Sequence, residues 1–249
     1  MEMSVHLVEE IRQGDIDLQA PRPHLLAVGR PSKPALVSPA KLPRRGFSTQ
    51  TQRLAMAHAI AHIEFNAINL AWDAVWRFTG MPDQYYMDWA RVAGDETRHF
   101  NLLRKYMRER GSDYGAFDAH DGLWIMAERT SGDVLHRMAI VPRVLEARGL
   151  DVTPAMIGKF QDHGDTEMVE ILTTIYEEEI EHVRIGNEWY SSLCRDRGLE
   201  PISTFIDLLE KYEVVERSSG LNQPARIQAG FSFTELEAIK SFSGDNLNK

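Results

Sequence analysis

The chain has 249 residues, of which 43% are hydrophobic and 26% charged, and its formal net charge is −9 at pH 7. These values are typical of a globular protein with a substantial core, organised as one large domain or two small ones. The acidic balance argues against nucleic-acid binding, because contacts with phosphate groups require a basic surface.

The only cysteine is Cys194, which excludes an internal disulfide and any cysteine-based zinc or iron–sulfur cluster. No apolar run reaches the roughly 18–20 residues that a membrane-spanning helix needs, and the N-terminus lacks the apolar core of a signal peptide. We therefore expect a cytoplasmic protein that does not contact the membrane.

The first 46 residues are predicted to form an arm that packs on the rest of the domain. Residues 4–13 fit one short helix, and six prolines then fall between residues 21 and 43. Because proline lacks a backbone N–H and disrupts a helix interior, that stretch should be extended.

Two long helices are expected next, at about residues 48–78 and 82–111. Ser48 is a suitable N-cap for the first helix, and Gly80 marks the turn between the two. On the first helix, Glu64 falls on the apolar face; on the second, Glu96 and His99 interrupt the apolar stripe.

The spacing of Glu96 and His99 suits a shared metal ion. Residues three apart on a helix differ by about 60° around the axis and about 4.5 Å along it, so both side chains can reach one centre. His58 and His62 are four residues apart, which also suits a metal, but His62 lies about 200° around the helix from Glu64. We therefore interpret His62 as a surface residue or a neighbour of the ligands.

The second half begins with a loop at 111–121 and a helical region from about 122 to 148. Pro142 should kink this helix, or a new helix starts there, and Glu146 points inward one turn later. Gly149 is expected to end the helix, and a new one to run from Thr153 to about residue 162.

The last long helix is expected at about 166–197, with Glu179 and His182 on its apolar face. Glu177, Glu178 and Glu181 are interpreted as solvated. Tyr176, one turn before Glu179, is a candidate redox or hydrogen-bonding residue near the metals; the alternative is a packed core tyrosine.

The C-terminal part is predicted to hold a short helix at 202–212 and a polar tail at 213–249 with one weak helix near 233–241. The tail is expected to cover a bundle end or to mediate contact in a homodimer.

The two halves repeat one pattern. Glu64 precedes Glu96 by 32 residues, and Glu146 precedes Glu179 by 33. In each half an inward Glu is followed by a turn and then by an inward Glu-x-x-His. Since helices joined by short turns are antiparallel neighbours, the lone Glu should lie level with the pair.

Packed face to face, the two halves would form one site of four carboxylates and two imidazoles: Glu64, Glu96, His99, Glu146, Glu179 and His182. This is the ligand set of ferritin-like di-iron and di-manganese carboxylate proteins. We therefore predict an all-α, ferritin-like four-helix bundle over residues 47–212, with one extra helix and a crossover between helices 2 and 3, in a single domain overall.

The metal prediction follows from charge and ligand type. Four ionised carboxylates in an apolar core repel one another, and two divalent cations would balance them. Oxygen-rich ligation suits iron, with manganese or a mixed Mn/Fe pair as alternatives, whereas zinc prefers fewer ligands and more His or Cys. A single Glu-x-x-His is common without a metal, but six such residues on inward faces, arranged as a repeat, favour a site.

Several segments also resemble a bacterial family of unknown function in the ferritin-like superfamily. The resemblance covers about residues 45–210 and lies in Tyr114-Gly115, in 120–124 (HDGLW), in 141–154 (VPRVLEARGLDVTP) and in 175–189. It implies a ferritin-like bundle with a di-iron-type site at the same six positions, while Gly94-Asp95 departs from the family pattern.

The site favours an O2-activating oxidase or hydroxylase that acts on a small molecule and receives electrons from a separate donor. An alternative is iron or manganese binding without an organic substrate, as in a ferroxidase or storage protein. A third is a helical interaction protein with a relic site.

Overall fold

The computed structural model describes residues 10, 29–43, 45–214 and 220–246. The expected helix at 4–13 and most of the proline-rich stretch lie outside these residues. The described residues confirm an all-helical protein and contain no strand beyond an isolated bridge. The chain forms two compact units, Met1–Ile125 with Ile157–Ile171 and Met126–Met156 with Leu172–Lys249.

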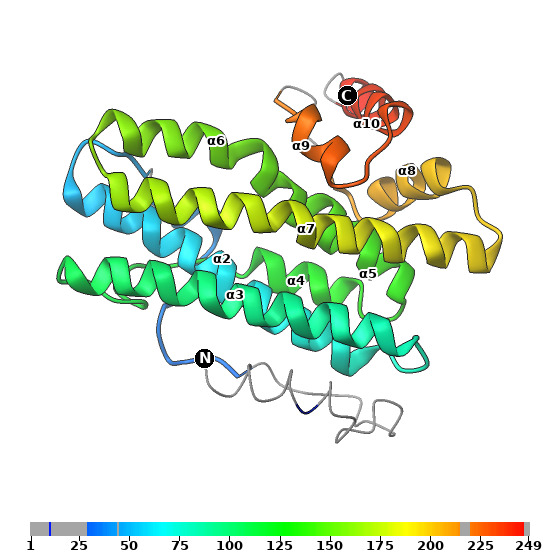
Figure 1. Ribbon diagram of the computed structural model, residues 1–249, viewed down its shortest axis with the longest axis horizontal. Coiled ribbons are helices and arrows are strands. Elements are labelled where there is room, and N and C mark those ends of the chain that lie inside the picture. The colour runs from blue at the N-terminus through cyan, green and yellow to red at the C-terminus, as the bar shows by residue number, and fades with distance from the viewer. Residues whose placement is uncertain (1–9, 11–28, 44, 215–219, 247–249) are drawn as a thin grey trace. The chain divides into compact units, whose positions relative to one another are not determined.

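The first unit is built on two long helices that lie side by side, α2 (Gln50–Arg77) and α3 (Asp83–Glu109) (Figure 1). Thr49, and not Ser48 as expected, caps α2. The Thr49 hydroxyl accepts from the Gln52 N–H and the Gln52 side chain accepts from the Thr49 N–H, both at 3.2 Å. This capping box satisfies two of the donors at the helix start.

The turn between α2 and α3 is fixed by Gly80 and Tyr86. Gly80 has φ +77°, a left-handed conformation that favours glycine. The Tyr86 hydroxyl donates to the Phe78 carbonyl at 3.0 Å and accepts from the Met81 N–H at 3.1 Å. The helices therefore run antiparallel, which brings Glu64 level with Glu96.

A loop at residues 110–121 and the described part of the arm complete one side of this unit. The arm holds a short 3₁₀ helix, η1 (Pro39–Lys41), and a parallel bridge joins Leu36 to Ala119. Val37 N–H donates to the Ala119 carbonyl at 2.8 Å, and Ala119 N–H donates to the Ala35 carbonyl at 3.0 Å.

The helical region that follows the loop is broken where one continuous helix was expected. Helix α4 (Gly122–Arg129) ends early, and Asp133 caps α5 (Val134–Ile140) by accepting from the Leu135 N–H at 2.7 Å. A π-helix, η2 (Val141–Glu146), follows and leads directly into α6 (Ala147–Asp162).

The π-helix decides between the two alternatives for Pro142. The helical backbone does not restart at Pro142; it widens, and the Ala147 N–H donates to the Pro142 carbonyl five residues earlier. A wider turn accommodates the proline ring, which would clash with the carbonyl four residues before it in an α-helix.

The expected break between Gly149 and Thr153 is wrong, because α6 continues through both Gly149 and Pro154. Pro154 deprives the Leu150 carbonyl of its usual helical donor. The side-chain amide of Asn222, from the C-terminal part of the chain, donates to that carbonyl at 3.0 Å instead. A long-range contact therefore replaces the lost bond.

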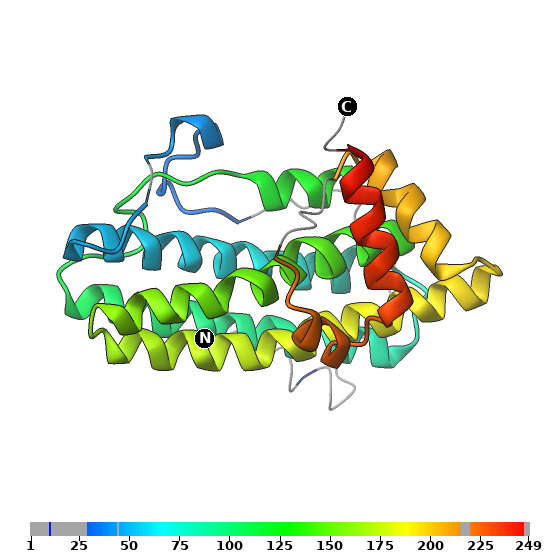
Figure 2. The ribbon, with the colours of Figure 1, turned by 90° about the horizontal axis from the view of Figure 1, so that it is seen from above.

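The remaining helices are α7 (Thr166–Arg197), α8 (Pro201–Lys211), α9 (Gln223–Gln228) and α10 (Phe233–Asn246). The bounds of α7 agree with the prediction, whereas the tail holds two helices where one was expected. Helices α8 and α10 lie side by side (Figure 2) and bury Phe205, Leu209, Leu236 and Ile239. No helix of the described residues combines the length and apolarity needed to cross a membrane.

Candidate metal centre

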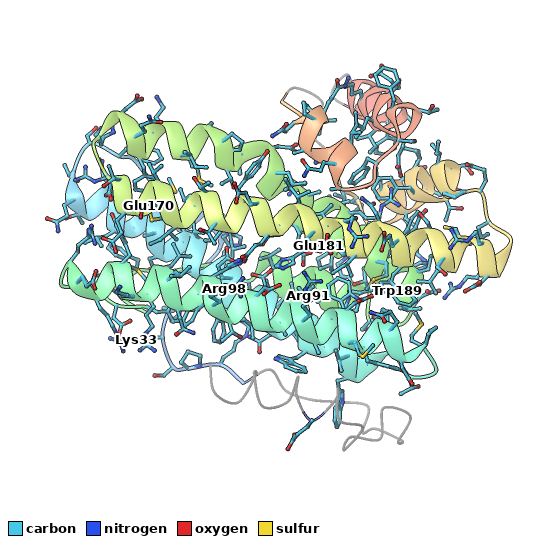
Figure 3. The ribbon with its side chains drawn as sticks, in the orientation of Figure 1. Lys33, Arg91, Arg98, Glu170, Glu181 and Trp189 are labelled. Carbon is cyan, nitrogen blue, oxygen red and sulfur yellow. The ribbon has the colours of Figure 1, made fainter. Side chains whose placement is uncertain are left out.

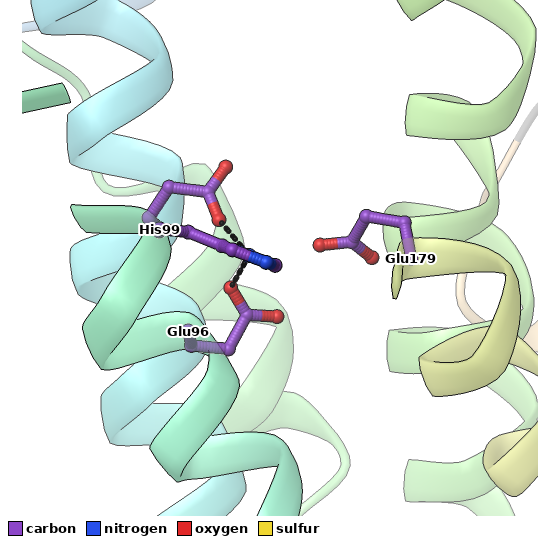
Figure 4. A group of neighbouring side chains, drawn as sticks. Glu96, His99 and Glu179 are labelled. Carbon is purple, nitrogen blue, oxygen red and sulfur yellow. Dashed lines mark hydrogen bonds and ion pairs between the residues drawn. The ribbon is translucent and has the colours of Figure 1, made fainter. Parts of the chain in front are cut away.

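The first unit brings Glu64, Glu96 and His99 together in its core. The side chains of these residues are at most 4% exposed. The His99 Nδ1 lies 3.3 Å from Glu64 Oε2 and 3.4 Å from Glu96 Oε2, so one imidazole nitrogen faces two carboxylates from neighbouring helices (Figure 4). The predicted meeting of a lone Glu with a Glu-x-x-His therefore occurs in this half.

The distribution of apolar and charged residues on α3 explains why Glu96 and His99 are buried. The face of α3 that carries Glu96 and His99 also carries four fully buried apolar side chains: Trp89, Val92, Leu103 and Tyr106. The opposite face is charged, and Arg91 and Arg98 (Figure 3) pair with Asp95. Two carboxylates and an imidazole thus lie within an apolar stripe, where solvent does not stabilise their charges.

Electrostatics in this group favour a bound cation. Burial raises the pKa of Glu64 well above its ordinary value, the neighbouring Glu96 charge raises it further, and the bond with His99 opposes both. A divalent cation would remove the reason for this rise, because it supplies the charge that the apolar surroundings lack. Two carboxylate oxygens and one imidazole nitrogen are suitable ligands for such an ion.

The second unit carries the matching residues on η2 and α7. His182 Nδ1 lies 3.7 Å from Glu179 Oε1, and these side chains are 1% and 13% exposed. The same imidazole nitrogen therefore faces the glutamate in both Glu-x-x-His pairs. Glu146, the last residue of η2, is half-buried.

The position of Glu146 is indicated by a close contact one turn away. Gly186 on α7 lies against Pro142, and a Cβ at residue 186 would overlap the proline ring. Pro142 is one turn before Glu146, and Gly186 is one turn after His182. Because α6 and α7 are joined by the short turn at Gly164, they run antiparallel, and Glu146 comes level with His182.

Three of the six predicted ligands therefore form a buried group in the first unit that can hold a metal ion. One ligand atom from each of Glu64, Glu96 and His99 lies within 4.8 Å of the others (Figure 4). Glu146, Glu179 and His182 belong to the second unit.

The comparisons with known proteins place the chain in a family. Residues 1–237 match the family described as "Protein of unknown function (DUF455)". The chain belongs to this family. An uncharacterized protein from Haemophilus influenzae is 48% identical over 216 residues, which cover 84% of this chain and 75% of the relative. No solved structure matches.

These matches confirm the resemblance to a family of unknown function. The DUF455 description names no reaction, and neither match names the ferritin-like superfamily.

In this DUF455 protein, His58 and His62 bind the loop at 110–121 to α2. His62 is 7% exposed, and its Nδ1 lies 2.7 Å from the Tyr114 hydroxyl. His58 Nε2 accepts from the Gly115 N–H at 2.9 Å, and its ring stacks on Tyr114. The surface interpretation of His62 is wrong, because the loop that covers it could not be read from the helical period.

The Tyr176 hydroxyl has a hydrogen-bond partner in the C-terminal segment. It accepts a hydrogen bond from the Asn222 side chain at 2.9 Å, so it contacts the C-terminal segment. Of the three acidic residues beside Glu179, Glu177 is exposed, Glu178 is half-buried, and Glu181 (Figure 3) pairs with Arg184 at 2.6 Å.

Proposed function

We propose that this protein is a ferritin-like, di-metal carboxylate enzyme that uses O2 to oxidise or hydroxylate a small organic molecule. The observation that carries the proposal is the buried group of Glu64, Glu96 and His99, in which one imidazole nitrogen lies within 3.4 Å of two carboxylates from neighbouring helices. The second Glu-x-x-His, with the same imidazole nitrogen facing its glutamate, supports a site of two ions.

The proposed architecture is a four-helix bundle of α2, α3, the η2–α6 helix and α7, with the crossover between α3 and η2. Its support is the repeated order of ligands: a lone Glu, a turn with a left-handed glycine, and a Glu-x-x-His. In this arrangement Glu64, Glu96 and His99 would hold one ion, and Glu146, Glu179 and His182 the other.

Iron is the metal that suits the proposed reaction. A pair of iron ions supplies, when bound, the electrons for the reduction of O2, and zinc has no such redox chemistry. The ligand residues would hold the ions in place, and the apolar side chains around α3 keep bulk water away from the site. Since Cys194 is the only cysteine, the chain cannot carry an iron–sulfur cluster of its own, and we assign electron delivery to a separate protein.

Anaerobic loading with Fe(II), followed by admission of O2, tests the proposal. We expect two irons per chain by metal analysis, O2 consumption and an O2-dependent change in absorbance. Glu179→Gln should lose at least one iron, whereas the control Glu177→Gln, two residues away and exposed, should behave as the wild type. Less than one bound iron, or no effect of Glu179→Gln, would sink the proposal. Many irons per chain would point to storage instead.

A further inference from the structure

Arg143 is buried on the π-helix one turn before Glu146, and the C-terminal segment supplies its counter-charge. It is 2% exposed and forms an ion pair with Glu235 of α10, itself 8% exposed. The centre of its guanidinium lies 4.0 Å from the ring centroid of Tyr190, and it also contacts two further rings, Phe205 at 4.2 Å and Phe231 at 5.1 Å. A charged group is thus enclosed by aromatic rings and one carboxylate.

A second buried ion pair joins the C-terminal segment to α6, after Glu146 in the sequence. Arg226 of α9 is fully buried and donates to both carboxylate oxygens of Asp151 on α6, at 3.0 and 2.7 Å. Asp151 also accepts from the Asn222 backbone N–H at 2.8 Å. The C-terminal segment therefore contacts this helical region at two places: at Arg143, three residues before Glu146, and at Asp151, five residues after it.

The energetics of these pairs indicate a role in specifying position. Burying an ion pair usually gains no stability over apolar residues of the same size, because removing both charges from water costs about as much as their attraction returns. Removing one partner, in contrast, leaves an uncompensated buried charge. Arg143 can therefore occupy its site only where Glu235 and the rings are already assembled.

The position of Arg143 matters because the π-helix determines where Glu146 points. A π turn contains one residue more than an α turn, so a change from π to α register would rotate the following side chains by about 100°. Pro142 lies against Gly186 at the start of this turn. Arg143 is the next residue, so its ion pair with Glu235 of the C-terminal segment can favour the π register over the α register.

We infer that the Arg143–Glu235 pair positions Glu146 as a metal ligand, and that docking of α10 thereby sets the affinity of the second metal position. The inference rests on the proposed function, because it takes Glu146 and His182 as ligands of that ion. Arg143 and Glu235 act through the helix register and are positioning residues; the first position, on α2 and α3, is independent of them.

Titration of the apoprotein with Co(II), followed by calorimetry and visible absorbance, tests the inference. The wild type should bind two ions. Glu235→Gln should keep one ion at wild-type affinity and bind the other about 10- to 100-fold more weakly, the range typical of residues that orient a ligand. Glu235→Asp should restore much of the loss. Glu237→Gln is the control, since Glu237 lies on the same helix, is exposed and pairs with Lys240.

Two further measurements distinguish a loss of metal affinity from misfolding of the variant. The double variant Arg143→Met, Glu235→Leu removes both charges and keeps an apolar core, so it should fold and still bind the second ion weakly. Hydrogen exchange of the Ala147 amide, which donates to Pro142, should accelerate in both variants. If either folded variant binds two ions like the wild type, the inference is wrong. If the wild type binds none, the proposed function fails as well.

Discussion

The two halves of the chain carry the same ligand pattern on differently built supports. In the first half, Glu64, Glu96 and His99 lie on two regular α-helices, and their side chains are at most 4% exposed. In the second half, Glu146 ends a π-helix and is half-buried, and the Glu179 side chain is 13% exposed. The first half thus depends on helix periodicity alone, whereas the second also needs contacts with distant parts of the chain.

This difference has a physical consequence. Regular helices have one hydrogen-bonding register, so the first group of ligands is fixed once α2 and α3 pack together. A π turn is a minor form that tertiary contacts must select. The second half therefore has a separate element that can alter its metal affinity, and the first does not.

The largest expected effect comes from removing a buried carboxylate of the first half. Glu96→Gln should weaken metal binding by more than about 100-fold, since loss of a ligand costs more than loss of a residue that orients one. In the metal-free protein the same change should raise the free energy of unfolding, because it removes the charge that raises the pKa of Glu64. Glu179→Gln should weaken binding with less gain in stability, because Glu179 is more exposed.

Metal titration and urea unfolding of the apoprotein measure these two effects. Glu109→Gln, at the exposed end of α3, is the control and should change neither. A Glu96→Gln apoprotein less stable than the wild type would show that Glu96 has a structural role, and would contradict our interpretation.

Two glycines near the ligands provide the next test. A Cβ at Gly186 would overlap the Pro142 ring, whereas a Cβ at Gly94, two residues before Glu96, meets no atom within 4 Å. Gly186→Ala should therefore destabilise the protein by about 1–3 kcal/mol through overpacking. Gly94→Ala should stabilise it by about 0.5–1 kcal/mol, because alanine is the better helix former. Thermal unfolding of both variants measures these stability changes. Equal changes for Gly186→Ala and Gly94→Ala would show that the two halves tolerate an added methyl group equally.

The same contrast explains what could be predicted from the sequence. The helices of the first half and all of α7 follow from periodic apolar residues and from glycines at turns, and the positions of Glu64, Glu96 and His99 follow from those helices. Periodicity reports only which face of a helix is buried, and it assumes 3.6 residues per turn. The inward position of Glu146 was predicted, but the π-helix that presents it was not.

The wrong predictions share a cause, which is that contacts with residues distant in the sequence are not reported by helical periodicity. Asn222 donates to the Leu150 carbonyl and allows α6 to continue past Pro154. Tyr114 covers His62, which local sequence places on the surface. The buried arginines Arg143 and Arg226 were missed because charged residues are usually exposed, and their acidic partners lie far away in the sequence.

A smaller effect is expected on the pH dependence of the first half. The pKa of His58 is lowered from 6.5 to about 4, chiefly by burial and to a lesser extent by the nearby His62 and Arg45, with Asp118 opposing them. Between these two pH values the unfolded chain binds a proton that the folded chain does not, so the free energy of unfolding should fall as pH is lowered from 6.5 towards 4. It should not change through this group above that range.

His58→Gln isolates this contribution, because a glutamine can still accept the Gly115 N–H but does not titrate. Urea unfolding at several pH values should show a shallower loss of stability in acid for the variant than for the wild type. Parallel curves for the two proteins would mean that His58 becomes protonated in the folded state without cost.

The smallest effect is expected for Tyr176 in the second half. Its hydroxyl accepts from Asn222, the residue that also donates to Leu150. Tyr176→Phe should therefore cost about 0.5–1.5 kcal/mol, the usual contribution of one hydrogen bond, and should leave two metal ions bound. Metal content and O2 consumption measured on the same sample separate this role from chemistry at the site: a redox tyrosine would lose O2-dependent activity with its metal content and stability nearly unchanged. Because the Asn222 contact directs the hydroxyl to the C-terminal segment, we expect activity to follow stability instead.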